Sequence, residues 1–389
     1  MAAALALLLL ALPPTCGALH LQQPSPALRP LRRAAAGAVR RARPPRSDQT
    51  SSPSLDELPD AVGSTLFGKQ PPTLTLLAPA KINLFLRVTR KREDGFHELA
   101  SLFQTVSLFD TLDFWAHDRA DAPQCSMEVT PNSLGYDMIP TDESNLVMRA
   151  LQLFAERTGE TRRIHCRLHK AIPAQGGLGG GSCDAATALF AANRLAGYPV
   201  SQDTLIEWGA ELGSDVSFFF SRGSAYCTGR GEIIEPLKQP LPPTVCYLIK
   251  PAVGCSTPAV FKALGLEPGQ SLDGPDPRVL LEEFQKSVYS ATFINDLEPP
   301  AFSVLPMLKN LREDLSKFGF QAVMMSGSGS TLFCIGMPLD EVIDTWKDEL
   351  LAKYDVDIFE ELFCRRLEDE RLWYTEQPAD AELTNIDVY

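Results

Sequence analysis

The residues best suited to do chemistry in this chain form a glycine-rich loop directly ahead of a small-residue, apolar stretch. Residues 172–190 read IPAQGGLGGGSCDAATALF, so five glycines and a serine precede the apolar side chains. Glycine permits positive φ and close approach of the backbone, so several N–H groups can point at one anion. A helix beginning here adds unpaired amides and the positive end of its dipole, which favour phosphate. The segment predicts a phosphate-binding loop, and the alternative is a flexible loop without a ligand.

This loop differs from two widespread nucleotide-binding motifs. No Gly-Lys-Ser/Thr ends it, as a Walker A loop requires, and no ribose-binding acid follows a βαβ opening, as the Rossmann motif requires. Ser182 is placed either to cap the helix or to contact a metal-bound phosphate oxygen.

A carboxylate further along the chain has the setting of a general base. Transfer of phosphate to an alcohol needs the charge of the triphosphate neutralised and usually a carboxylate that accepts the hydroxyl proton. Asp215 follows a helix-ending glycine and precedes the apolar run 216–220. We therefore expect it at the edge of a core, where desolvation can tune it. The alternative is an ordinary turn aspartate.

Several elements must position these residues. Residues 73–88 alternate as a half-buried strand does, which predicts Lys81 and Asn83 side by side on its exposed face. Helical spacing covers 146–157, 185–195 and 203–212, the last closed by Gly213. The runs 216–220 and 245–250 have strand length. The proline-rich loop 238–244 is the preferred domain boundary.

The first 47 residues have the composition of a targeting presequence. Ala and Leu fill residues 2–12, as in a signal-peptide core, and residues 19–47 contain seven arginines and no acid, as in a transit peptide. The two in series predict import into a complex plastid through the secretory pathway. The alternatives are a single transit peptide or a plain secretory signal. Residues 48–72 predict a linker, and 367–389 an acidic terminal tail.

Charge and cysteine usage exclude other classes of protein. The net charge of the chain is −13, and removal of the basic presequence makes the remainder more acidic, so nucleic acid is not an expected partner. The nine cysteines show no Cys-x-x-Cys and no zinc spacing, which favours reduced, buried thiols. No membrane association is expected of the mature form.

Residues 173–186 resemble the phosphate-binding motif of GHMP kinases, in the GGLGGGS form of the 4-diphosphocytidyl-2-C-methyl-D-erythritol kinases. Gln175, Cys183 and Asp184 depart from the usual wording of that subgroup, where a small residue, Ser and Asn are common. The resemblance runs in order from residue 74 to 336. It implies that ATP is bound together with Mg²⁺, whose ligands it does not assign, and that the ATP is held by Pro173, Ala174, Gln175, Gly176, Gly177, Leu178, Gly179, Gly180, Gly181 and Ser182.

The same resemblance implies roles for residues outside the loop. Gly213-Ser-Asp-Val is similar to the motif whose aspartate, here Asp215, is the base, and Lys81 matches the lysine that pairs with it, aided by Asn83. The segment Asp94-Gly-Phe-His resembles an element that contacts cytosine. Taken alone, Lys81 would be a solvated lysine, His97 a loop residue and Phe261 core filler. The cytosine contacts implied are Phe96, His97, Thr257 and Phe261.

The resemblance implies an α+β fold with two domains. Residues 73–240 would form a domain like ribosomal protein S5 domain 2, and 241–366 a ferredoxin-like domain. The implied reaction is ATP-dependent phosphorylation of the C2 hydroxyl of the CDP-linked polyol in the non-mevalonate isoprenoid pathway of plastids, by a monomer or homodimer. The alternatives are a GHMP kinase with another acceptor and a non-enzymatic nucleotide-binding relative.

Overall fold

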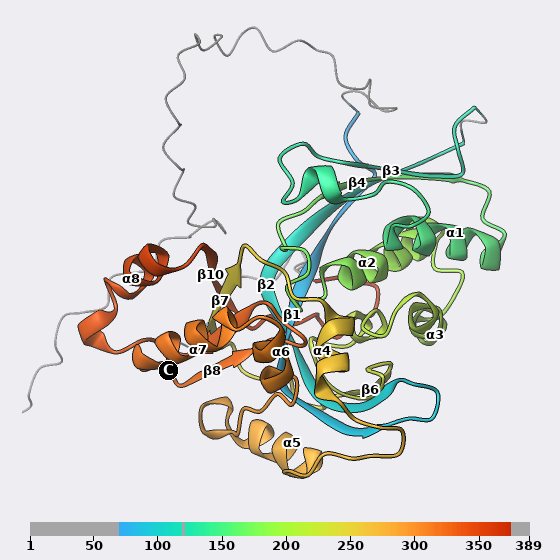
Figure 1. Ribbon diagram of the computed structural model, residues 1–389. Coiled ribbons are helices and arrows are strands. Elements are labelled where there is room, and N and C mark those ends of the chain that lie inside the picture. The colour runs from blue at the N-terminus through green and yellow to red at the C-terminus, as the bar shows by residue number, and fades with distance from the viewer. Residues whose placement is uncertain (1–69, 119–120, 375–389) are drawn as a thin grey trace, which may run out of the picture. The chain divides into compact units, whose positions relative to one another are not determined.

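The computed structural model describes residues 70–118 and 121–374 (Figure 1). The predicted presequence 1–47, most of the linker 48–72 and residues 375–389 lie outside the described residues. Within the described part, two β-sheets each carry helices, which confirms the predicted α+β class. In this part of the chain, no helix combines the length and the apolar character needed to cross a membrane.

The first sheet is built on one long antiparallel hairpin. Strand β1 pairs with β2 along nearly its whole length. The other edge of β2 pairs with β5 through residues 99–104 and with β4 through residues 111–117. Strand β3 pairs with β4 in parallel, and β6 pairs with β5 in antiparallel orientation. The strands of this sheet are β1 (Leu74–Lys91), β2 (His97–His117), β3 (Cys125–Val129), β4 (Arg163–His169), β5 (Ser224–Gly229) and β6 (Ile233–Pro236).

Three helices form a layer beside the first sheet, with α2 directly against β1 and β2, α1 against β3, and α3 packed on α1 and α2. They are α1 (Leu146–Thr158), α2 (Gly180–Leu195) and α3 (Gln202–Leu212). Local signals set their ends: the Asn145 side chain accepts from the amide of Val147 at 2.9 Å, and α1 stops at Gly159 in the left-handed region. All three predicted helices are confirmed. Helix α2, however, begins at Gly180 instead of 185, so its first turn is part of the glycine loop.

Two expectations about exposure and strand length were wrong. The predicted exposed face of β1 is covered, because Lys81 is 4% and Asn83 1% exposed. The run 216–220 is not a strand but contains the 3-10 helix η2 (Ser217–Phe220). Its phenylalanines are buried, with Phe218 edge-on to Phe103 at 5.2 Å. A short apolar run buried all round has no periodicity that distinguishes strand from helix.

The second sheet has the order β10-β7-β9-β8, with every pairing antiparallel. This is the order of a ferredoxin-like βαββαβ unit. Helices α6 and α7 pack on one face, while α5 packs against the first sheet, where the ring of Phe284 lies 6.0 Å from that of Phe85 in β1. The elements are β7 (Val245–Pro251), α4 (Thr257–Leu264), α5 (Pro277–Lys286), α6 (Glu298–Val304), α7 (Met307–Lys317), β8 (Ala322–Met325), β9 (Leu332–Ile335), α8 (Trp346–Lys353) and β10 (Val356–Leu362), with the 3-10 turns η1 (Tyr136–Met138), η3 (Val288–Ser290) and η4 (Asp340–Val342).

After β10 the chain returns to the first sheet. Phe363 bridges to Val106, and Trp373 and Tyr374 are fully buried. The bounds of the predicted tail 367–389 stay a prediction, but two large aromatic side chains in its first eight residues belong to the core. The domain division at 240/241 stays a prediction.

Candidate active site

The glycine loop joins β4 to α2 and contacts both sheets. Gln175, Gly177 and Gly179 have φ of 52°, 75° and 72°, so the loop relies on left-handed backbone that glycine adopts at little cost. A Cβ on Gly177 would lie 2.2 Å from the carbonyl oxygen of Ser326. The Ser326 hydroxyl donates to the Gly177 carbonyl at 3.0 Å. The loop therefore packs tightly against residues 326–331, the second glycine turn.

A cavity of about 340 Å³ lies along this loop. One wall is the loop, and the opposite wall includes Ile139, Asn145 and Leu146. Residues 173–181 all line the cavity, as expected of a phosphate-binding segment. Ser182 does not line it: this serine lies half-buried in the first turn of α2, three residues after the N-cap Gly179.

Lys81 and Asp215 meet on the other side of the loop. The Lys81 ammonium lies 3.3 Å from Oδ2 of Asp215 and donates to Oδ1 of Asn83 at 2.8 Å. It also lies 4.4 Å from the centre of the Phe103 ring. The Lys81 amide donates to the Leu178 carbonyl at 2.9 Å, which ties β1 to the loop. The Asp215 side chain remains 29% exposed, so it can receive a substrate proton.

A second cavity, of about 740 Å³, contains this pair. It also contains the predicted cytosine contacts. Gly177 and Gly179 line both cavities, so the glycine loop is their common wall. A phosphate bound at the loop can therefore face an acceptor held in the larger cavity. The predicted residues that line it are Lys81, Asn83, Phe96, His97, Asp215, Thr257 and Phe261.

The predicted cytosine contacts are only partly assembled. His97 and Phe261 are stacked with ring centres 4.8 Å apart and 28° between planes. The Thr257 hydroxyl lies 2.6 Å from that of Ser328. Phe96 is 53% exposed and lies under the guanidinium of Arg230, 5.1 Å from the ring centre. The structure thus brings His97 and Phe261 together and leaves Phe96 apart from them.

His97 is set up as a neutral hydrogen-bonding group. Burial, assisted by the charge of Lys91, lowers the pKa of His97 below its ordinary 6.5. Its Nε2 atom is buried and has no hydrogen-bond partner among the described residues. A neutral imidazole can donate from one nitrogen and accept at the other.

Comparison with known proteins places this geometry in a family. Residues 145–223 match the model of the GHMP kinase N-terminal domain, and residues 278–352 that of the GHMP kinase C-terminal domain. The chain is 43% identical over 321 residues to the chloroplastic 4-diphosphocytidyl-2-C-methyl-D-erythritol kinase of Oryza sativa subsp. japonica, covering 80% of this chain and 75% of the relative. The chain belongs to the 4-diphosphocytidyl-2-C-methyl-D-erythritol kinase family of GHMP kinases.

Bacterial and structural relatives agree with this assignment to the family. The kinase of Protochlamydia amoebophila of the same name is 44% identical over 265 residues, 68% of this chain and 85% of the relative. A crystal structure of 4-(cytidine 5'-diphospho)-2C-methyl-D-erythritol kinase is 32% identical with a TM-score of 0.59, covering 74% of this chain and 99% of that one. Homoserine kinase from Cytophaga hutchinsonii, 17% identical with a TM-score of 0.52 and covering 74% and 94%, shows the shared fold alone.

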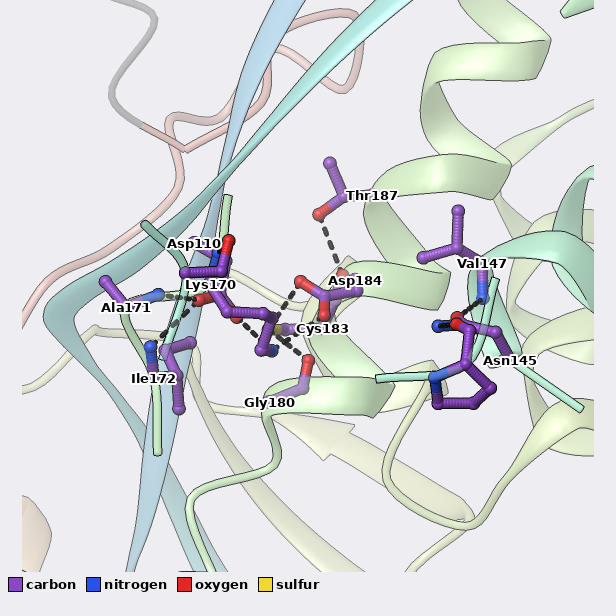
Figure 2. A network of polar contacts seen from close by, with 12 residues as sticks. Asp110, Asn145, Val147, Lys170, Ala171, Ile172, Gly180, Cys183, Asp184 and Thr187 are labelled. Atoms are coloured by element: carbon purple, nitrogen blue, oxygen red, sulfur yellow. Dashed lines mark hydrogen bonds and ion pairs between the residues drawn. The ribbon is translucent and has the colours of Figure 1, made fainter. Parts of the chain in front are cut away.

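A buried ionic network beneath the loop of this GHMP kinase was missed by sequence reasoning. Lys170, at the end of β4, pairs with Asp110 and, at 2.8 Å, with Asp184 (Figure 2). The amides of Ala171 and Ile172 donate to Asp110 at 2.6 and 2.9 Å. Asp184, one of the departures from the subgroup pattern, therefore pairs with a lysine instead of capping the helix. The available signal in the sequence was Lys170, three residues ahead of the motif. Nothing in the sequence pointed to its partner Asp110, which lies 60 residues earlier.

Burial and the charges of neighbouring groups shift the pKa values of Asp184 and Lys170. Burial raises the pKa of Asp184 to about 8, and the Asp110 charge adds to the rise, although Lys170 opposes it. Burial alone would lower the pKa of Lys170, but the two carboxylates more than offset it, and the net shift is upward. Lys170 therefore stays cationic, and a Cβ on Gly180 would lie 3.0 Å from its ammonium. The network supports the start of α2 from below.

Proposed function

We propose that this chain transfers the γ-phosphate of ATP to the C2 hydroxyl of 4-diphosphocytidyl-2-C-methyl-D-erythritol, giving the 2-phosphate in the non-mevalonate isoprenoid pathway. The observation that carries the proposal is the Lys81–Asp215 pair at 3.3 Å, in a cavity that shares the glycine loop with a second cavity. A phosphate donor held at that loop can therefore face an alcohol acceptor in the larger cavity. The names of the relatives identify the acceptor.

The proposed reaction uses the chain's own groups as follows. Loop amides and the N-terminus of α2 hold the phosphates of ATP at residues 173–182. Asp215 accepts the proton of the acceptor hydroxyl, whose oxygen bonds to the γ-phosphorus while the bond from that phosphorus to ADP breaks. The Lys81 ammonium stabilises the charge on the acceptor oxygen, and Asn83 orients Lys81.

Mg²⁺ is the implied metal, and the residues beside the loop fit it. The hydroxyl of Ser182, half-buried in the first turn of α2, is a hard oxygen donor of the kind that Mg²⁺ accepts alongside phosphate oxygens. When bound, the ion would neutralise charge on the phosphates. The cluster of Asp110, Cys183 and Asp184 is a poorer candidate, because it is buried around the Lys170 ammonium.

Phe96, His97, Thr257 and Phe261 would hold cytosine. His97 and Phe261 offer ring faces, and the buried Nε2 of His97 offers a hydrogen-bonding atom once the stacked pair opens. Cytosine has both a donor and acceptors on its edge, so a neutral imidazole suits it.

We also propose that the protein acts in the plastid stroma as a monomer or homodimer. A signal peptide followed by a transit peptide would direct its import there. The chloroplastic plant relatives and the arginine-rich, acid-free composition of residues 19–47 support this location. Fluorescence microscopy of residues 1–72 fused to a reporter tests it, since secretion of the reporter would contradict it.

The test of the reaction is ADP release by the chain from residue 64 onward, with ATP and Mg²⁺. The acceptors are the CDP-linked polyol, mevalonate and homoserine, each offered to wild type and Asp215→Asn. We expect turnover with the CDP-linked acceptor alone and a loss of about 10²- to 10⁴-fold in the variant. Asp203→Asn, on the exposed start of α3, is the control and should keep full activity.

Turnover with another acceptor would reject the proposed substrate and keep the GHMP kinase assignment. A folded protein that binds ATP without turning over any acceptor would instead support the non-enzymatic alternative.

A further inference from the structure

An arginine lies in a turn that reaches both ends of the larger cavity. Arg230 lines this cavity in the turn from β5 to β6. Its guanidinium lies over Phe96 at the cytosine end. The next residue, Gly231, is beside the catalytic end, since a Cβ there would lie 3.5 Å from Oδ1 of Asp215. The turn that carries Arg230 thus runs from Phe96 to Asp215, along the path between the expected positions of the base and of the reacting hydroxyl.

The guanidinium of Arg230 is held loosely. Its ion pair with Glu232 measures 3.5 Å, whereas Arg278 and Glu235 on the neighbouring edge lie 2.8 Å apart. Glu232 is engaged by the backbone instead, because it accepts from the Arg230 amide at 2.5 Å. A guanidinium has five N–H donors, so a loose ion pair and a ring contact leave donors for a ligand.

The chemistry of the acceptor favours a cation at this point. A nucleoside-diphosphate-linked polyol has, in linear order, a base, a ribose, two phosphates and the polyol. With the base at His97 and Phe261 and the hydroxyl at Asp215, the diphosphate spans the region of Arg230. The chain carries a net charge of −13, so binding of a dianion needs a local positive group. The planar fork of arginine matches phosphate oxygens.

We propose that Arg230 binds the diphosphate of the acceptor and so makes the kinase specific for a nucleotide-linked polyol over a free one. This inference rests on the proposed function for the identity of the acceptor. Lys91, also in the cavity, donates to the Leu266 carbonyl at 2.7 Å and is committed to the fold. Arg230 is therefore better placed than Lys91. Lys262 of α4 also lines the cavity, but it is next to Phe261 in the chain, at the end expected to hold the base.

The test is calorimetric binding of CDP and of cytidine to the chain from residue 64 onward, as wild type, Arg230→Met and Arg230→Lys. Cytidine has the base and ribose but no phosphate, so the ratio of the two affinities isolates the diphosphate. We expect Arg230→Met to lose about 10- to 100-fold for CDP and nothing for cytidine. Arg230→Lys should recover part of the loss, since it keeps the charge without the fork.

Arg278→Met is the matched control. Arg278 lies over the Tyr226 ring at 4.3 Å and pairs with Glu235, as Arg230 does with Phe96 and Glu232, but it does not line the cavity. The Arg278→Met variant should bind CDP and cytidine with the affinities of wild type. Unchanged CDP binding in Arg230→Met, or an equal loss for CDP and cytidine, would overturn the proposal.

Failure of this inference and failure of the proposed function give different results. Wild type that binds CDP through Arg230 but phosphorylates no CDP-linked polyol would contradict the function and support the diphosphate site. Wild type that phosphorylates this acceptor while Arg230→Met binds CDP normally would support the function and reject the role of Arg230.

Discussion

At the scale of single residues, the least expected feature is the cluster of two carboxylates on one lysine. Asp110 and Asp184 are buried, and Lys170 supplies one positive charge for the two. A buried carboxylate whose charge is incompletely balanced holds a proton to higher pH than in water. The elevated pKa of Asp184, about 8, follows from this burial.

The raised pKa of Asp184 predicts a stability that falls with pH. The ordinary pKa is 3.8, so between about pH 4 and 8 the folded state holds a proton that the unfolded state has lost. The free energy of unfolding should decrease across this window by up to about 1.4 kcal/mol per pH unit. The raised pKa of Lys170 acts above its ordinary 10.5 and leaves this window unchanged.

Asp184→Asn removes the titrating group, so its free energy of unfolding should fall less between pH 5 and 8 than that of wild type. Urea unfolding at pH 5, 6.5 and 8 measures this difference. The exposed Asp203→Asn should follow wild type. Parallel pH profiles for wild type and Asp184→Asn would contradict the assignment.

At the scale of elements, the glycine loop is held by neighbours on two sides. The amide of Lys81 donates to Leu178 from β1, and Ser326 contacts Gly177 from the second glycine turn. Asn295 fixes that turn, since its amide group donates to the carbonyls of Met325 and Gly327 at 2.8 and 2.7 Å. The middle of β1 and the turn that follows β8 therefore set the position of the loop.

This packing predicts that Gly177→Ala weakens the use of ATP. The new Cβ would meet the Ser326 carbonyl at 2.2 Å, and φ of 75° disfavours alanine, so the loop must move. We expect kcat/KM for ATP to fall about 10- to 100-fold. Gly159→Ala is the control: φ is 70° but nothing lies within 4 Å, so it should cost about 1–2 kcal/mol of stability and keep normal ATP kinetics. Equal ATP kinetics in both variants would contradict this account.

At the scale of the whole molecule, residues 363–374 connect elements that carry the site. Trp373 stacks on Phe190 of α2 at 4.6 Å and lies edge-on to Phe220 of η2 at 5.6 Å. Arg366 donates to the Phe220 carbonyl at 3.1 Å and to Gln202 of α3 at 2.6 Å. Helix α2 begins at the phosphate loop and η2 follows Asp215, so this segment braces both from behind.

We expect Trp373→Ala to destabilise the protein by about 3–5 kcal/mol, as loss of a fully buried large aromatic side chain does. Chemical denaturation at constant pH measures the change. Trp373→Phe keeps the stacking on Phe190 and loses the 3.2 Å hydrogen bond to Thr187, so it should recover most of the stability. A change below about 1 kcal/mol in Trp373→Ala would show that the segment is not part of the core.

The sequence by itself determined the features that depend on residues close together in the chain. Glycine content and a following helix marked the phosphate loop, apolar spacing marked α1 and α3, Gly213 marked the end of α3, and motif resemblance named Lys81 and Asp215. Only the tertiary structure decided the burial of Lys81, the helical form of η2, the Lys170 network and the place of Arg230. The reason is physical: these features depend on contacts between segments far apart in the chain, and periodicity and turn chemistry act over a few residues.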